Sequence, residues 1–193
     1  MESELKYIDM VEQPISMNPL KFIVWLFIVA EVLFFAGLTS AYIVRQAEGN
    51  WLEFELPDIL WMNSGIAILS SVSLIWSNHC AKKDFFLGLN LGIALTLLLG
   101  IAFLVGQWYS LVSLVDQEVF FVGNPAGSFV YVLIIMHAFH LISGLIFMII
   151  LLILSLRLKV HSKAQDTLDM ATTYWHFLGG LWLYLFLFLL LNH

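Results

Sequence analysis

Hydrophobic residues gather into five long stretches along the chain, and short polar connections separate them. Crossing a hydrocarbon core of about 30 Å takes about 20 helical residues, and each stretch reaches that length. In lipid every backbone N–H and C=O must be satisfied internally, so these stretches predict transmembrane α-helices. The fold class is therefore all-α, a polytopic membrane protein. The five expected spans are residues 21–44, 59–78, 85–108, 128–156 and 172–191.

The segments between the spans are too short to form a second domain or an extramembrane active site. Residues 1–193 are therefore expected to form a single five-helix membrane domain, with residues 1–20 as a tail. This tail carries four acidic residues and lacks the basic flank and the cleavage site of a signal peptide. The first span is therefore expected to stay in the mature protein.

The positive charges are distributed unequally between the two sides of the predicted bundle. With five spans, the tail, the second connection and the fourth connection share one side, and the other side holds only Arg45. Basic loops stay in the cytoplasm, so the N-terminus is predicted to be cytoplasmic and His193 to be outside. The residues on the basic side are Lys6, Lys21, Lys82, Lys83, Arg157, Lys159 and Lys163.

The composition supports a membrane protein and excludes several other classes. Hydrophobic residues make up 61% of the chain and charged residues only 11%, against about 25% charged in ordinary soluble domains. A net charge of −6 lacks the basic surface that binding to nucleic acid requires. Cys80 is the single cysteine, and with His79 beside two lysines it forms a poor metal site, so we interpret this region as a solvated helix end.

Glu31 lies near the middle of the first span. An ionised carboxylate there costs several kcal/mol, so we expect the side chain to be protonated, hydrogen-bonded, or turned toward protein or water. A proton-handling or partner-facing carboxyl is one interpretation, and a neutral acid that pins two helices together is the other. His140 is its first candidate partner, because both residues lie near mid-membrane on antiparallel helices.

Three histidines raise the question of a haem or metal site. His137 and His140 are three residues apart and share one face of the fourth span, and His176 lies near the start of the fifth span. At about 1.5 Å per residue, His140 and His176 differ by about 10 Å in depth, which disfavours one iron between them. Histidines hydrogen-bonded within the bundle are therefore favoured over a bis-histidine cytochrome b-like anchor.

The remaining intramembrane features indicate anchoring and packing. No nucleophile with its base, phosphate-binding loop, dinucleotide fingerprint or carboxylate pair is present in the sequence, so the chain by itself is expected to be non-catalytic. Small residues on the spans predict close helix packing; they are Gly37, Ser64, Gly65, Ser70, Ser71, Gly88, Gly92, Gly179 and Gly180. Aromatic residues near the predicted boundaries fit an interfacial belt; they are Trp51, Trp61, Trp76, Trp108, Tyr109, Tyr174 and Trp175.

The polar landmarks together resemble subunit III of the haem-copper respiratory oxidases, in the shorter five-helix form found in bacteria. The resemblance extends from the first span to the end of the chain, and its strength comes from the order of several weak motifs. These motifs are residues 25–37, Asn63-Ser64 with Trp76 and His79, Gln107, His137-Ala-Phe-His140 followed by Gly144, and Tyr174-Trp175-His176-Phe177 with Trp182.

The resemblance implies an accessory subunit of a proton-translocating oxidase in the bacterial inner membrane, acting in aerobic respiration. It implies no catalytic, cofactor or metal site in this chain, with haem and copper in the partner subunits. Subunits I and II and membrane phospholipid are the implied partners, and the implied roles are to support proton entry and to keep subunit I active. Cytochrome c is favoured over quinol as the electron donor.

The resemblance also carries over a set of intramembrane polar residues that face lipid or subunit I. They are Glu31, Asn63, Gln107, His137, His140 and His176. Two positions depart from the pattern of many members, because Ser110 and Gly179 stand where those members have carboxylates. Polar contacts built on those two carboxylates are therefore not expected in this chain.

Overall fold

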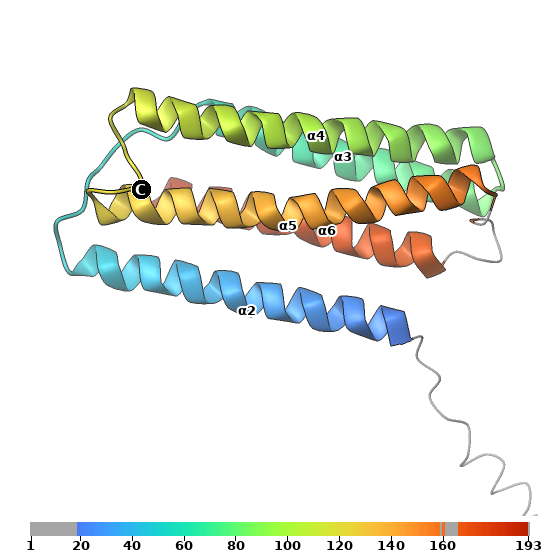
Figure 1. The fold of residues 1–193 in the computed structure, drawn as a ribbon, viewed down its shortest axis with the longest axis horizontal. Coiled ribbons are helices and arrows are strands. Elements are labelled where there is room, and N and C mark those ends of the chain that lie inside the picture. Colours follow the sequence, from blue (N-terminus) through green and yellow to red (C-terminus); the bar gives the residue numbers. More distant parts are fainter. Residues whose placement is uncertain (1–18, 159, 161–165, 193) are drawn as a thin grey trace, which may run out of the picture.

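The computed structural model describes residues 19–158, 160 and 166–192, and these residues form five α-helices without a strand (Figure 1). All five helices are long and apolar enough to cross a membrane, which confirms the predicted all-α fold class. The helices are α2 (Pro19–Ala47), α3 (Ile59–Lys82), α4 (Phe86–Asp116), α5 (Pro125–Leu156) and α6 (Asp166–Asn192).

The helices extend beyond most of the predicted spans, since backbone hydrogen bonding continues where the apolar run ends. α4 has 31 residues, which is about 46 Å of helix against a core of about 30 Å. α5 begins at Pro125 rather than residue 128, because the side chain of Asn124 accepts the N–H of Ala126 at 2.9 Å and proline suits the first helical position. α6 begins at Asp166 rather than residue 172.

The helices run side by side, with α5 and α6 in the middle of the bundle (Figure 1). α3 and α4 pack closely against each other and cover one side of this central pair. α2 lies on the other side, and α5 and α6 are the described helices that it contacts. Much of the surface of α2 therefore faces outward, and only the stripe that carries Ile28, Glu31, Phe35, Thr39 and Tyr42 is buried.

In the described bundle, α3 and α4 pack most closely, because small residues at their interface let the two backbones approach each other. The hydroxyls of Ser73 and Ser77 on α3 donate to the carbonyls of Gly92 at 3.0 Å and Leu89 at 2.9 Å on α4. A Cβ added at Gly92 would lie 2.6 Å from the Cβ of Ser77 and 3.0 Å from its Cα. The packing predicted from small residues is therefore confirmed at Gly92.

Three other glycines do not allow neighbouring helices to approach closely. Cys80, which we expected at a solvated helix end, also lies elsewhere. Among the described residues, a Cβ at Gly37, Gly65 or Gly180 would meet nothing within 4 Å, so the prediction of close packing within this chain is wrong there. Cys80 is buried rather than solvated, because α3 continues to Lys82 and the thiol turns toward α4, where a Cβ at Gly88 would lie 2.7 Å from its Sγ. His79 is exposed, as predicted.

Candidate functional site

Glu31 projects from the buried stripe of α2 toward α5 and α6, and its side chain is 2% exposed. Its Oε1 is hydrogen-bonded to the hydroxyl of Tyr174 on α6, with 2.8 Å between the two oxygens. The expectation that His140 would be the partner is therefore wrong. The reason is the side-chain length of Tyr174, which reaches across the α2–α6 interface. Oε2 of Glu31 is buried and has no hydrogen-bond partner among the described residues.

Tyr174 links Glu31 to α5. Its hydroxyl lies 2.8 Å from Oγ of Ser143, which in turn donates to the carbonyl of His140 at 2.6 Å. The sequence interpretation of Tyr174 and Trp175 as interfacial anchors is wrong, because they are 5% and 3% exposed. α6 begins at Asp166, so these residues lie about two turns inside the helix.

Four other residues of the predicted belt are accessible, and their place at a membrane boundary stays a prediction. Trp61, Trp76, Trp108 and Tyr109 are all exposed on the surface of the bundle, and Trp51 is half-buried.

Ser143 is a residue that the sequence did not single out. One signal was present in the sequence, because Ser143 follows His140 by three positions and therefore lies on the same face of the helix.

His137 and His140 turn toward a common aromatic neighbour, as their spacing predicts. Their ring centroids lie 6.4 Å and 5.5 Å from that of Phe35 on α2. His140 is half-buried, and its Nδ1–H donates to the carbonyl of Met136 at 2.7 Å, because a carbonyl can only accept. His137 is 1% exposed and packs between the rings of Phe103 at 5.8 Å and Trp182 at 5.4 Å.

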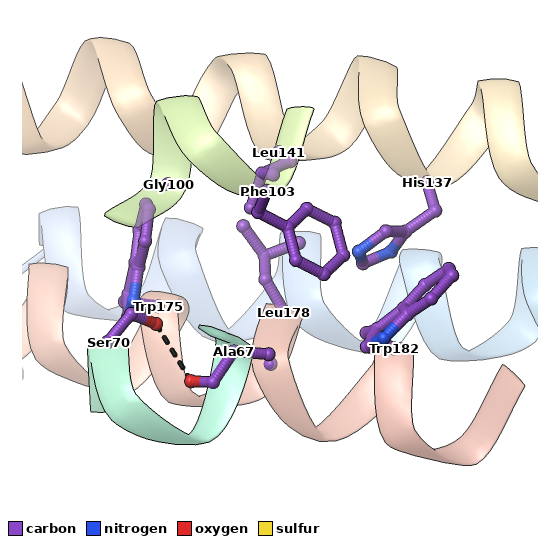
Figure 2. A pocket seen from close by; sticks show the side chains of 10 residues that line it. Ala67, Ser70, Gly100, Phe103, His137, Leu141, Trp175, Leu178 and Trp182 are labelled. Atoms are coloured by element: carbon purple, nitrogen blue, oxygen red, sulfur yellow. Dashed lines mark hydrogen bonds between the residues drawn. The ribbon is translucent and has the colours of Figure 1, made fainter. Parts of the chain in front are cut away.

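A small cavity of about 20 Å³ lies beside His137, between α3, α4, α5 and α6 (Figure 2). Trp175 lies at its other end, and its indole N–H donates to Oγ of Ser70 at 3.1 Å. Gly100 lines the cavity as well, and a Cβ there would lie 2.6 Å from Cη2 of Trp175. Neither ring nitrogen of His137 has a hydrogen-bond partner among the described residues.

Asn63 on α3 and Gln107 on α4 are both buried. The side-chain oxygen of Asn63 lies directly against Gly106, so closely that no Cβ fits at that position. Neither amide has a hydrogen-bond partner in the described part of the chain. Ser110 is buried one turn beyond Gln107 and donates to its carbonyl at 2.7 Å, so this hydroxyl makes only a local bond.

The predicted site residues are thus divided among several locations. Glu31 and the backbone of His140 are joined through Tyr174 and Ser143, whereas Asn63 and Gln107 are buried on the other two helices, α3 and α4. His176 is half-buried on α6, and among the described residues no hydrogen bond or ring contact joins it to either group. Within the described ranges, no three His, Cys, Asp or Glu side chains lie close enough to hold a metal ion. Gly179 lines the cavity beside His137.

The family described as cytochrome c oxidase subunit III matches residues 8–192, a range that includes all five helices. The chain belongs to this subunit III family. "Probable cytochrome c oxidase subunit 3" of Nocardia farcinica is 33% identical over 174 residues, which are 85% of this chain and 82% of the relative. "Cytochrome c oxidase subunit 3" of Corynebacterium diphtheriae is 33% identical over 171 residues, covering 83% and 82%. The Rattus norvegicus protein of that name is 26% identical over 187 residues, covering 90% and 69%.

Subunit III proteins are components of an oxidoreductase complex, so this chain is a multi-pass membrane subunit that assembles with other oxidase subunits. The resemblance drawn from the order of the polar motifs is confirmed by this match. No catalytic site is implied for subunit III itself. Within this subunit III, Glu31, Trp175 and Trp182 make buried hydrogen bonds that join its own helices, and His137 packs against the ring of Trp182.

Proposed function

We propose that this subunit III is a non-redox accessory subunit of a proton-pumping haem-copper oxidase in the bacterial inner membrane. It packs on the flank of subunit I beside subunit II, and those partner subunits carry the haems and copper. Cytochrome c is the electron donor, and the N-terminus of the chain is cytoplasmic. The observation that carries this proposal is the family match across the whole bundle.

The role of the chain is to hold phospholipid and to shield the proton entry of subunit I during turnover. Two grooves beside α2 support the lipid part of this proposal. One has a volume of about 780 Å³ and runs along Gly37, Ala41 and Val44 to Arg45, with Phe129 of α5 on its other wall. Its apolar wall suits an acyl chain. At its end the guanidinium of Arg45 is paired with the carboxylate of Glu48, which also lines the groove, at 3.2 Å.

The second groove lies between α2 and α6 and has a volume of about 440 Å³. Val32, Phe35, Leu181 and Tyr184 line it, and Gly180 leaves its floor open. Because α5 and α6 are the described helices that α2 contacts, both of its flanks are accessible. We propose that acyl chains occupy these flanks and complete the packing of α2 within the complex.

The direct test is to isolate the tagged chain with its complex in a mild detergent. We expect haem-containing oxidase subunits to copurify with it, and we expect the chain separated from them to show no haem Soret band. Phospholipid should remain in the isolated complex after loosely bound lipid has been washed away with detergent. A Soret band on the separated chain would support the cytochrome b-like anchor, and the absence of any haem-bearing partner would contradict the proposed function.

A double variant tests whether the paired histidines bind metal. We expect His137→Ala with His140→Ala to leave the iron and copper content of the complex unchanged, because the rings contact aromatic side chains of this chain. Retention of the chain should fall, since removing the packed ring of His137 costs about 1–3 kcal/mol. Metal analysis per complex is the measurement, and the exposed His79→Ala is the matched control. Stoichiometric loss of iron or copper would contradict the prediction.

A further inference from the structure

Three short oxygen–oxygen contacts join α2, α6 and α5 inside the membrane-spanning part of the bundle. Oε1 of Glu31 lies 2.8 Å from the hydroxyl of Tyr174, and that hydroxyl lies 2.8 Å from Oγ of Ser143. Oγ of Ser143 lies 2.6 Å from the carbonyl oxygen of His140. All three distances are in the range of good O–H···O hydrogen bonds.

The number of protons available in this chain of contacts determines which oxygen donates in each hydrogen bond. Three hydrogen bonds need three protons, and the hydroxyls of Tyr174 and Ser143 supply one each. The carbonyl of His140 has none and can only accept. The third proton must therefore come from the other end of the chain, the carboxyl of Glu31.

An ionised Glu31 leaves one of these contacts without a proton. Tyr174 would then donate to the carboxylate, and Ser143 could donate either to Tyr174 or to the carbonyl of His140, but not to both. Two oxygens at 2.6–2.8 Å without a proton between them repel each other. The observed geometry, with all three contacts short, therefore belongs to the three-proton state.

The charges around Glu31 agree with this count. Neither α5 nor α6 contains a lysine or arginine, and the titratable side chains that face Glu31 from these helices are His140 and Tyr174. On α2, Lys21 and Arg45 lie about 15 Å and 21 Å away along the helix axis. Oε2 has no hydrogen-bond partner among the described residues, and leaving a buried carboxylate oxygen unpaired is far more costly than leaving the carbonyl oxygen of a neutral acid unpaired.

We propose that Glu31 carries a proton and begins a one-directional hydrogen-bond chain, in which Glu31 donates to Tyr174, Tyr174 to Ser143, and Ser143 to the carbonyl of His140. Tyr174 and Ser143 are thus positioning residues, and they couple the protonation of Glu31 to the backbone of α5. When Glu31 loses this proton, the Tyr174 hydroxyl rotates and donates its hydrogen bond to the carboxylate instead of to Ser143. Loss of the proton also opens either the Tyr174–Ser143 contact or the bond to the carbonyl of His140.

Infrared difference spectra of the intact complex test this chain of bonds. The wild-type minus Glu31→Gln spectrum should show the C=O band of a protonated carboxyl that shifts in D2O. Tyr174→Phe should move this band to higher frequency, because the carboxyl O–H loses its acceptor. Ser143→Ala should move it less, since the substitution removes only the next bond, and this small change keeps the variant foldable.

Tyr184→Phe is the matched control. Tyr184 also lies on α6 and hydrogen-bonds to α2, through Oγ1 of Thr39 at 3.0 Å, but it is outside the chain of three bonds. This variant should leave the carboxyl band unchanged. A Glu31 signal with carboxylate bands alone would overturn the proposal. The C=O band of a protonated carboxyl could also respond equally to Tyr174→Phe and Tyr184→Phe, or fail to respond to Tyr174→Phe and Ser143→Ala. Either result would overturn the proposal that Glu31 donates to Tyr174 and that Tyr174 and Ser143 belong to the hydrogen-bond chain.

Discussion

An oxidase complex stripped of this chain should keep its haem spectrum and begin to turn over, and then lose its activity as turnover continues. The physical reason is that a bundle without a catalytic site can influence oxygen reduction only through what it packs against. Under the proposed function, removing it would expose the flank of subunit I and release lipid beside α2, while the haems would stay ligated by other subunits. Proton uptake should also become slower at raised pH.

The measurement is oxygen consumption followed through many turnovers, with the visible spectrum recorded before and after. Readdition of the purified chain with phospholipid is the control, and it should restore the lifetime of the activity. Inactivity from the first turnover with correctly ligated haems would contradict the accessory role. A stripped complex as durable and as pH-tolerant as the intact one would contradict it equally.

Gly92→Ala should destabilise the chain strongly by separating α3 from α4. The new methyl group would lie 2.6 Å from the Cβ and 3.0 Å from the Cα of Ser77, and a helix backbone cannot move aside as a flexible side chain can. Overpacking of this kind costs about 1–3 kcal/mol, which is about 5- to 150-fold in the folding equilibrium. The hydrogen bonds from Ser73 and Ser77 to α4 should lengthen as well.

Thermal denaturation of the detergent-solubilised complex, followed by retention of the chain, measures this effect. Gly65→Ala is the matched control, because Gly65 lies within α3 and a Cβ there meets nothing within 4 Å in the described part of the chain. Both substitutions gain the same helix propensity, so the control should be neutral or slightly stabilising. Equal stability of the two variants would show that the contact between α3 and α4 is not as close as the structure has it.

The sequence by itself determined the fold class and the number of spans. Hydrocarbon solvates no backbone polar group, so a run of about 20 apolar residues has only the helix available to it, whatever its neighbours are. The interfacial positions of Trp61, Trp76, Trp108 and Tyr109 rest on the sequence as well; their side chains are exposed on the bundle, and their place at a membrane boundary stays a prediction. The sidedness of the termini also rests on the sequence alone, through the distribution of lysine and arginine, and it stays a prediction.

The sequence predicted the helix ends less well, because hydropathy reports where lipid is and not where backbone hydrogen bonding stops. α4 continues to Asp116, past the predicted end at residue 108, and α6 begins at Asp166. This second difference placed Tyr174 and Trp175 inside the bundle rather than at the interface. A few residues of error at a boundary were thus enough to change the interpretation of two aromatic side chains.

The tertiary structure alone decided which polar groups meet. Depth along the membrane correctly placed Glu31 near α5, but the rotation and separation of the helices gave its hydrogen bond to Tyr174 and not to His140. The same is true of the glycines, since Gly92 closes the α3–α4 interface while Gly37, with the same side chain, faces open space. Lipid is as apolar as the side chains themselves, so hydropathy does not specify which faces of two membrane helices pack together. Those faces are selected by close packing and by hydrogen bonds between residues far apart in the sequence, and these exist only once the bundle has formed.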